Sequence, residues 1–282
     1  MKRVLLVYLP AAGDALLRGA MPWLTTKSWR PLRIAFPPLP SVLQATLETG
    51  QPPAVHGVFG RRTLSGEEVE TKESWLTGLE GDFGLSKSAV LYVREDGLLT
   101  ALARGDESVL EHANELDAKL RHICEEDEDL AIIVIGGPSP AAFDRSLDPT
   151  AFVPHGAGFQ AEGVLLRIDA ALSADERSRA IMEAGVERVL HGEARSRRGC
   201  DHSEAGQTLV VAQPDWGFES DERFLFGREE AGVLGEPFVA VCGGSLEEAA
   251  GNWPNAIHDL RIAPTVADHL GHETGGFAER AL

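Results

Sequence analysis

The chain has 282 residues, 43 % of them hydrophobic and 25 % charged, which is the composition of a soluble globular protein. Its acidic residues outnumber Lys and Arg by 44 to 26, and the net charge of -18 disfavours nucleic acid and anionic membranes as partners. The length fits one large domain with a sizeable core. Its apolar runs stay below the roughly 18 residues that a membrane-spanning helix needs.

The cysteines and the N-terminus bear on the cellular compartment. Cys124, Cys200 and Cys242 lie far apart and form no CxxC pair. A sparse, odd number of cysteines argues against a disulfide framework and favours a reducing compartment. The apolar run Val4–Leu9 is too short for a signal peptide, and Pro10 interrupts it. We therefore expect a cytoplasmic protein whose first apolar run is a buried strand.

Short apolar runs recur along the chain and predict strands that are covered on both faces of a sheet. In chain order they are Val4–Leu9, Ala89–Val93, Leu130–Ile135, Gly163–Ile168, Thr208–Ala212 and Pro237–Val241. Three-to-four spacing of apolar residues predicts an amphipathic helix over Glu107–Glu125. Its apolar stripe is Leu110, Ala113, Leu116, Leu120 and Ile123. The capping-box pattern at Ser173 predicts a second helix, which extends to Val189.

This alternation of strands and helices predicts a three-layer α/β/α sandwich with a mostly parallel sheet. The whole chain, 1–282, is expected to form one domain. The segment over about 140–206 carries its own strand-like and helix-like runs, so we interpret it as a small cap inserted into the main sheet.

The most specific stretch is Phe36–Gly60, FPPLPSVLQATLETGQPPAVHGVFG. It resembles the nucleotide pyrophosphatase and phosphodiesterase branch of the alkaline phosphatase superfamily, in which the nucleophile segment leads to A-T-x-x-T-G-x-x-P-x-x-H-G. The matching positions here are Ala45, Thr46, Thr49, Gly50, Pro53, His56 and Gly57. The M-P-W-L of Met21–Leu24 and the A-P-T segment of Ile262–Gly271 are similar to the same family. The resemblance implies an alkaline phosphatase-like fold over nearly the whole chain.

Members of this family hold two divalent metals, such as zinc or manganese, with Asp and His ligands, and the metals activate a Thr or Ser nucleophile. The resemblance assigns these ligand and nucleophile positions to Leu9, Pro40, Leu98, Leu102, Gly136 and Gly137. No histidine occurs from Ser203 to Ile257 to supply the last ligand. Leu, Pro and Gly side chains cannot coordinate a divalent ion, so we expect no metal, no other cofactor and no catalytic residue of the family type.

The sequence therefore predicts a non-catalytic relative that binds a partner protein or a small ligand in the former active-site cleft, as a scaffold or regulatory subunit. An alternative is a divergent phosphoric ester hydrolase, acting on phosphodiesters or pyrophosphates, with Ser41 or Ser139 as a substitute nucleophile. A third interpretation is a structural remnant within a homo-oligomer. Gly136, Gly137 and Ser139 follow a buried strand and are candidate ligand contacts in an anion-binding nest. His56 is expected to organise the turn that follows a helix.

Overall fold

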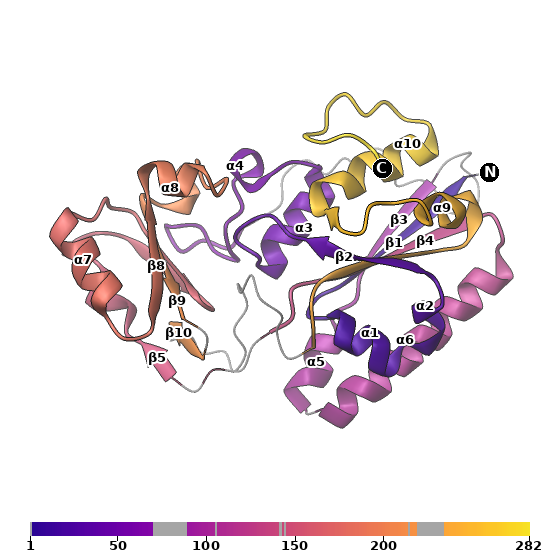
Figure 1. Cartoon of the computed structure of the whole chain (residues 1–282), viewed down its shortest axis with the longest axis horizontal. Coiled ribbons are helices and arrows are strands. Elements are labelled where there is room, and N and C mark those ends of the chain that lie inside the picture. Colours follow the sequence, from indigo (N-terminus) through magenta and orange to yellow (C-terminus); the bar gives the residue numbers. More distant parts are fainter. Residues whose placement is uncertain are drawn as a thin grey trace.

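The structure is a computed structural model, and it describes residues 2–69, 89–104, 106–140, 143, 145–213, 215–218 and 234–282. Within these ranges, the main sheet has six strands in the order β12-β2-β11-β4-β1-β3 (Figure 1). They are β1 (Arg3–Leu9), β2 (Ser28–Arg33), β3 (Ala89–Arg94), β4 (Leu130–Gly136), β11 (Phe238–Cys242) and β12 (Ile257–His258). β1 pairs in parallel with β3 and β4, as β12 does with β2, whereas β11 runs antiparallel to both its neighbours. The predicted mostly parallel sheet is confirmed.

Helices cover both faces of this sheet (Figure 1). One layer contains α1 (Asp14–Ala20), α2 (Pro22–Thr25), α5 (Gly97–Arg104) and α6 (Asp106–Glu126). The other contains α3 (Pro40–Thr49), α9 (Gly244–Ala250) and α10 (Ile262–Leu270), with α4 (Pro53–His56) after α3 and the 3-10 turn η4 (Asp259–Arg261) before α10. Successive side chains of a strand point to opposite faces, so β1 supplies both cores. Leu5, Val7 and Leu9 face the first layer, and Val4, Leu6 and Tyr8 face the second. The three-layer sandwich is confirmed.

A second sheet forms a smaller lobe beside the main one (Figure 1). In the described residues its order is β6-β7-β9-β8, with antiparallel pairing throughout. Its elements are β6 (Phe159–Glu162), β7 (Leu165–Ile168), α7 (Ala174–Met182), β8 (Val186–His191), α8 (Gly192–Ser196) and β9 (Thr208–Ala212), with 3-10 turns η2 (Pro149–Phe152) and η3 (Ser203–Ala205). A separate pair joins β5 (Arg145–Leu147) to β10 (Trp216–Phe218).

This lobe extends past residue 206, where the sequence placed the end of the cap. β9 pairs with β7 and β8, and β10 contacts both β7 and β9. The apolar run Thr208–Ala212 is a strand, as predicted, but it belongs to the second sheet. An apolar run predicts a buried strand without indicating which sheet the strand joins.

Two predicted helices differ in detail from the observed ones. In α6, Ala113, Leu116 and Leu120 of the predicted stripe pack in the core, whereas Leu110 is 45 % exposed and Ile123 is 37 % exposed. Val109 is buried in place of Leu110. α7 has the predicted capping box but ends at Met182. Gly185 follows with φ +96°, in the left-handed region, and the chain continues as β8 instead of the helix predicted to Val189.

A separate apolar cluster, which we call the lobe-interface core, joins the two lobes. It contains Phe36, Leu39, Val42 and Phe59 from the N-terminal part of the chain, and Leu165, Leu190, Cys200, Ala205, Leu209 and Val211 from the second lobe. The lobes are therefore held together by buried apolar surface. No helix in the described part of the chain is both long and apolar enough to cross a bilayer.

Candidate functional site

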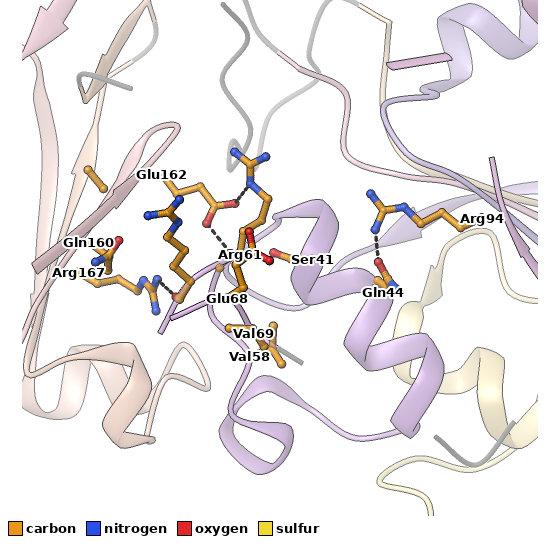
Figure 2. A pocket seen from close by; sticks show the side chains of 13 residues that line it. Ser41, Gln44, Val58, Arg61, Glu68, Val69, Arg94, Gln160, Glu162 and Arg167 are labelled. Carbon is orange, nitrogen blue, oxygen red and sulfur yellow. Dashed lines mark hydrogen bonds and ion pairs between the residues drawn. The ribbon is translucent and has the colours of Figure 1, made fainter. Parts of the chain in front are cut away.

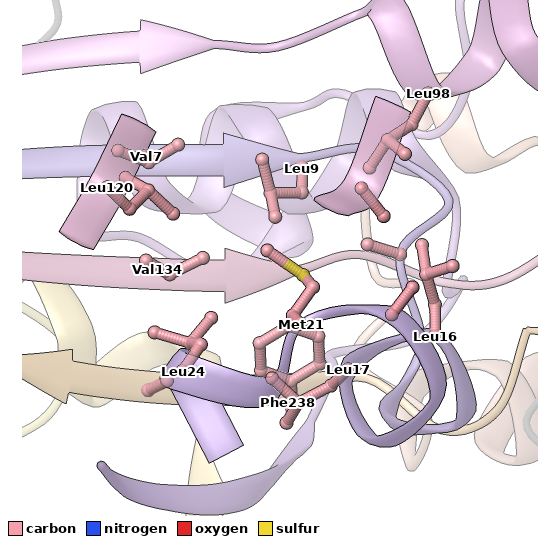
Figure 3. Packing of buried hydrophobic residues seen from close by; sticks show 14 of the residues in the cluster. Val7, Leu9, Leu16, Leu17, Met21, Leu24, Leu98, Leu120, Val134 and Phe238 are labelled. Carbon is pink, nitrogen blue, oxygen red and sulfur yellow. The ribbon is translucent and has the colours of Figure 1, made fainter. Parts of the chain in front are cut away.

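The residue that the resemblance assigns to the first metal ligand is Leu9, the last residue of β1. Its side chain is fully buried among apolar neighbours, and Figure 3 shows it in the same cluster as Leu98. Leu102 belongs to this cluster too. Leu9 is in register with Gly136 of β4, and the amide N–H of Gly137 donates to the carbonyl oxygen of Leu9 at 2.9 Å. The structure thus brings these positions together, as part of the core under α1 and α5.

Pro40, at the expected nucleophile position, lies on the other face of the sheet, in the first turn of α3. The residue of β1 that contacts it, where α3 packs against the sheet, is Tyr8 and not Leu9. The Tyr8 hydroxyl donates to the Pro40 carbonyl oxygen at 3.2 Å. Burial raises the pKa of Tyr8 well above its usual value, so the phenol stays protonated and remains a donor. The side chain at the end of β1 that faces α3 is therefore a tyrosine, which the sequence reasoning missed because it counted one residue further along the strand.

Polar groups of the Gly-Gly-Pro-Ser turn after β4 form hydrogen bonds with other parts of the chain. Gly137 donates to Leu9, as described, and the Ser139 hydroxyl accepts the N–H of Leu234 at 2.7 Å. A Cβ at Gly136 would lie 2.3 Å from the Phe238 ring, so the close packing of β4 against β11 requires glycine there. Ligand contact by Gly136, Gly137 and Ser139 stays a prediction, and the Gly137 N–H and the Ser139 hydroxyl already have partners within the chain.

A pocket of about 540 Å³ opens between α3, the end of β3 and the second lobe (Figure 2). Arginines are prominent in its lining, and we call it the arginine pocket. The polar side chains that line it are Ser41, Gln44, Arg61, Arg62, Glu68, Arg94, Gln160, Glu162 and Arg167. It combines residues far apart in sequence, because the two lobes supply opposite walls.

On the main-domain wall, Arg94 extends from the end of β3 towards α3. Its Nε donates to Asp96 Oδ1 at 2.8 Å, and its Nη1 donates to the side-chain oxygen of Gln44. Ser41 lies in the first turn of α3, where backbone N–H groups and the helix dipole favour negative charge. Its hydroxyl oxygen is buried and has no hydrogen-bond partner in the described residues. This wall can therefore offer guanidinium, hydroxyl and helix-terminal donors.

On the second-lobe wall, Arg167 is only 2 % exposed although it lies in the apolar strand β7. Its Nη1 donates to the Glu204 carbonyl at 2.9 Å, and its Nη2 donates to the Arg62 carbonyl at 2.5 Å. Glu162 accepts the backbone N–H of Arg61 at 2.8 Å, and its other oxygen lies 3.7 Å from Arg61 Nε. Burial raises the pKa of Glu162 and lowers that of Arg167.

The arginine pocket can recognise an oxyanion. Guanidinium groups donate in a planar fork that matches carboxylate and phosphate oxygens. Its carboxylates, Glu68 and Glu162, offset part of the positive charge. Among the residues that the structure describes, no three His, Cys, Asp or Glu side chains gather where they could hold a metal ion.

His56 organises the turn after α3, as the sequence predicts. Its Nδ1 accepts the N–H of Val58 at 3.0 Å, so the neutral ring carries its proton on Nε2, which lies 3.2 Å from Thr46 Oγ1. Burial, with a smaller effect of nearby His202, lowers the pKa of His56 to about 4. The ring is therefore neutral at physiological pH and couples α3 to α4.

No protein-family model and no curated protein sequence matches this chain. Solved structures do match, over almost its full length. Murine ectonucleotide pyrophosphatase/phosphodiesterase 5, as an inactive variant in complex with AMP, is 12 % identical with a TM-score of 0.73, over 97 % of this chain and 96 % of that chain. The human protein of the same name is 12 % identical with a TM-score of 0.74, over 99 % and 96 % of the two chains.

Phosphonoacetate hydrolase from Sinorhizobium meliloti 1021, in complex with phosphonoformate, is 13 % identical with a TM-score of 0.71, over 96 % of this chain and 95 % of that chain. The chain has the fold of these proteins. The structural similarity establishes the fold. At such low sequence identity it does not establish the activity, which has to be argued from the site. The shared fold agrees with the alkaline phosphatase-like architecture that the Phe36–Gly60 resemblance implies.

The arginine pocket was not predicted, although the sequence held one signal for it. Arg167 interrupts the apolar run Gly163–Ile168, and a charged residue inside a buried strand must find polar partners. Arg61 and Arg62 directly follow the family-like segment. Nothing in the sequence, however, indicates that these residues meet Arg94 across a pocket.

Proposed function

We propose that the protein is a non-catalytic member of the nucleotide pyrophosphatase/phosphodiesterase family that binds an anionic small molecule in the arginine pocket. The observation that carries the proposal is the placement of Arg61, Arg94 and Arg167, from both lobes, around one pocket of a chain with net charge -18. An acidic surface repels anions in general, so a local group of arginines gives one place where an anion is attracted.

The size of the pocket favours a small ligand over a partner protein. Small-molecule sites have volumes of about 300–1,000 Å³, and the arginine pocket has about 540 Å³. A phosphate monoester or a phosphonate is the ligand class we propose, because a tetrahedral oxyanion can accept from several guanidinium N–H groups at once. AMP and phosphonoformate are bound by two of the structurally similar proteins.

The absence of catalysis is supported by what fills the strand ends. Leu9, Leu98 and Leu102 are buried together on the face opposite to α3, where each contributes about 1.5–3 kcal/mol through apolar burial. Tyr8 occupies the space between β1 and the start of α3, where its hydroxyl is bonded to the Pro40 carbonyl. A divalent-metal site at these positions requires Asp and His side chains that deprotonate and bind the ion. The residues present are leucines on one face of the sheet, and tyrosine and proline on the face beside α3.

One observation favours a second candidate, a divergent phosphoric ester hydrolase. Ser41 lines the arginine pocket, and its buried hydroxyl oxygen has no partner in the described part of the chain. A serine at a helix N-terminus beside arginines has the surroundings of a nucleophile that attacks a phosphoryl group. The hydrolase would also require a general base next to Ser41 to accept the proton of its hydroxyl.

Calorimetric titration of AMP in the presence of EDTA tests the binding. We expect binding by the wild-type protein and a loss of affinity of about tenfold or more in Arg94→Gln, because a charge-assisted hydrogen bond contributes about 1.5–3 kcal/mol. Arg18→Gln is the matched control, since it removes the same charge from an exposed arginine of α1. Equal affinities of the two variants, or no binding of AMP or inorganic phosphate, would refute the proposed pocket.

Turnover separates the two candidates. Bis(p-nitrophenyl) phosphate is incubated with the protein and added zinc or manganese, and release of nitrophenol is followed by absorbance. We expect no release above that of the buffer. Metal-dependent release that disappears in Ser41→Ala would establish the hydrolase and overturn the non-catalytic proposal.

A further inference from the structure

A pair of thiols lies at the end of the main sheet opposite to the arginine pocket. Cys242 is the last residue of β11, is fully buried, and is in register with Ile132 near the start of β4. Cys124 lies in the last turn of α6 and packs against the same core. Cys242 Sγ donates to the Ile132 carbonyl oxygen at 3.7 Å, and a Cβ on the next residue, Gly243, would lie 3.1 Å from Cys124 Sγ. Two free thiols from distant parts of the chain therefore lie at the same corner of the core.

The backbone next to Cys242 makes room for the second sulfur. Gly243 has φ +77°, a conformation that favours glycine. A Cβ at this position would lie 2.3 Å from the Leu130 carbonyl oxygen and 3.1 Å from Cys124 Sγ. Glycine thus lets α6 bring its cysteine against the end of β11.

The surroundings make the two thiols unequal. The neighbouring Cys242 side chain lowers the pKa of Cys124, burial acts in the opposite direction, and the nearby ammonium of Lys27 lowers it further. The neighbouring Cys124 side chain and burial raise the pKa of Cys242. Thiolates, not thiols, are the nucleophiles, so Cys124 is the sulfur that reacts first and Cys242 is placed to react second.

We propose that Cys124 and Cys242 form a reversible disulfide when the protein meets a peroxide, linking the end of α6 to the end of β11. The Cys124 thiolate attacks one oxygen of hydrogen peroxide, the O–O bond breaks, and hydroxide leaves, so that Cys124 becomes a sulfenic acid. The sulfur of Cys242 then attacks the Cys124 sulfur, the S–O bond breaks, and the hydroxyl leaves as water with the thiol proton. The two sulfurs lose two electrons in total, and the peroxide is reduced to water once the first hydroxide takes up a proton.

The third cysteine provides an internal control. Cys200 is buried in the lobe-interface core, and burial raises its pKa to about 12, against the smaller opposite effects of Arg195 and Arg198. It is therefore a protonated thiol without a neighbouring cysteine, and we expect it to stay reduced under conditions that oxidise the other two.

The test treats the wild-type protein with a small excess of hydrogen peroxide and counts thiols after denaturation. We expect the count to fall from three to one, the mass to fall by two hydrogen atoms, and non-reducing peptide mapping to show a peptide that links Cys124 to Cys242. Dithiothreitol should restore all thiols. Cys200→Ser should form the same link, and Cys124→Ser should not.

Several results would overturn the proposal. They are a thiol count that stays at three, oxidation of Cys200 in place of the pair, a sulfenic or sulfinic acid that persists on Cys124 beside a free Cys242, and disulfides only between molecules. The peptide map of the wild-type protein decides the matter without any variant, so poor folding of Cys124→Ser does not affect the conclusion.

Discussion

Neutral His56 makes the stability of the protein depend on pH in a defined direction. Its pKa falls from an ordinary 6.5 to about 4 on folding, chiefly because the ring is buried and secondly because of His202. Between these two values the unfolded chain binds a proton that the folded chain does not. Acidification therefore favours unfolding, and the stability that the neutral ring provides is present above about pH 6.5 and lost as the pH falls towards 4.

The magnitude follows from the two pKa values. Linkage gives a loss of about 2 kcal/mol from His56 between about pH 8 and pH 5, and partial solvent exposure of the ring reduces the expected loss to about 1–2 kcal/mol. We would measure urea unfolding at both pH values for the wild-type protein, for His56→Gln, and for Val55→Ala. Val55 is 62 % exposed in the same helix and carries no titratable group, so it serves as the control.

We expect the difference in unfolding free energy between the two pH values to be smaller in His56→Gln than in the wild-type protein, and unchanged in Val55→Ala. Other groups titrate in this range, and the comparison among the three proteins removes their common contribution. If His56→Gln loses as much stability on acidification as the wild-type protein, then His56 does not carry the proposed burial effect and the reasoning fails.

The remaining predictions concern stability and are tested by urea unfolding. Leu9→Ala should cost about 2–5 kcal/mol, because a fully buried leucine leaves a cavity in the core; a smaller loss would show that the strand end is loosely packed. Tyr8→Phe should cost about 0.5–1.5 kcal/mol through its lost bond to Pro40, and no loss would show that the bond is dispensable. Asp117→Ala should cost about 1–3 kcal/mol, because this buried carboxylate accepts N–H groups at the start of α2; Asp117→Asn should retain part of that stability.

The architecture of the protein was largely predictable from local sequence patterns. Val4–Leu9 and Leu130–Ile135 are continuous apolar runs, and burial of both faces is what makes such runs recognisable. The assignment of Thr208–Ala212 to a sheet was not predictable, since the same pattern suits a strand in either lobe. β2, SWRPLR, lacks the apolar signal because most of its residues are only partly buried.

The site was harder to predict than the fold. The residue spacing of the family motif locates the end of β1 correctly. Neighbouring residues of a strand point to opposite faces of the sheet, however, so an error of one position selects Leu9 where Tyr8 is the residue that faces α3. The arginine pocket depends on the approach of α3 and β3 to β6 and β7, which are far apart in sequence. The one sequence signal for it is the charge of Arg167 within an apolar run, and the structure shows this residue buried.

The lobe-interface core has a consequence for the modularity of the chain. Phe36, Leu39 and Val42 come from the segment that most resembles the phosphodiesterases, yet they are buried against strands of the second lobe. Excision of residues 145–218 would leave these side chains in water, and the excised piece would expose Leu165 and Leu209 in turn. We therefore expect neither lobe to fold without the other. If the second lobe were replaced by that of a related protein, the start of α3 would have to be replaced with it to keep the apolar contacts. We therefore expect the two segments to change together in evolution, although more than a hundred residues separate them.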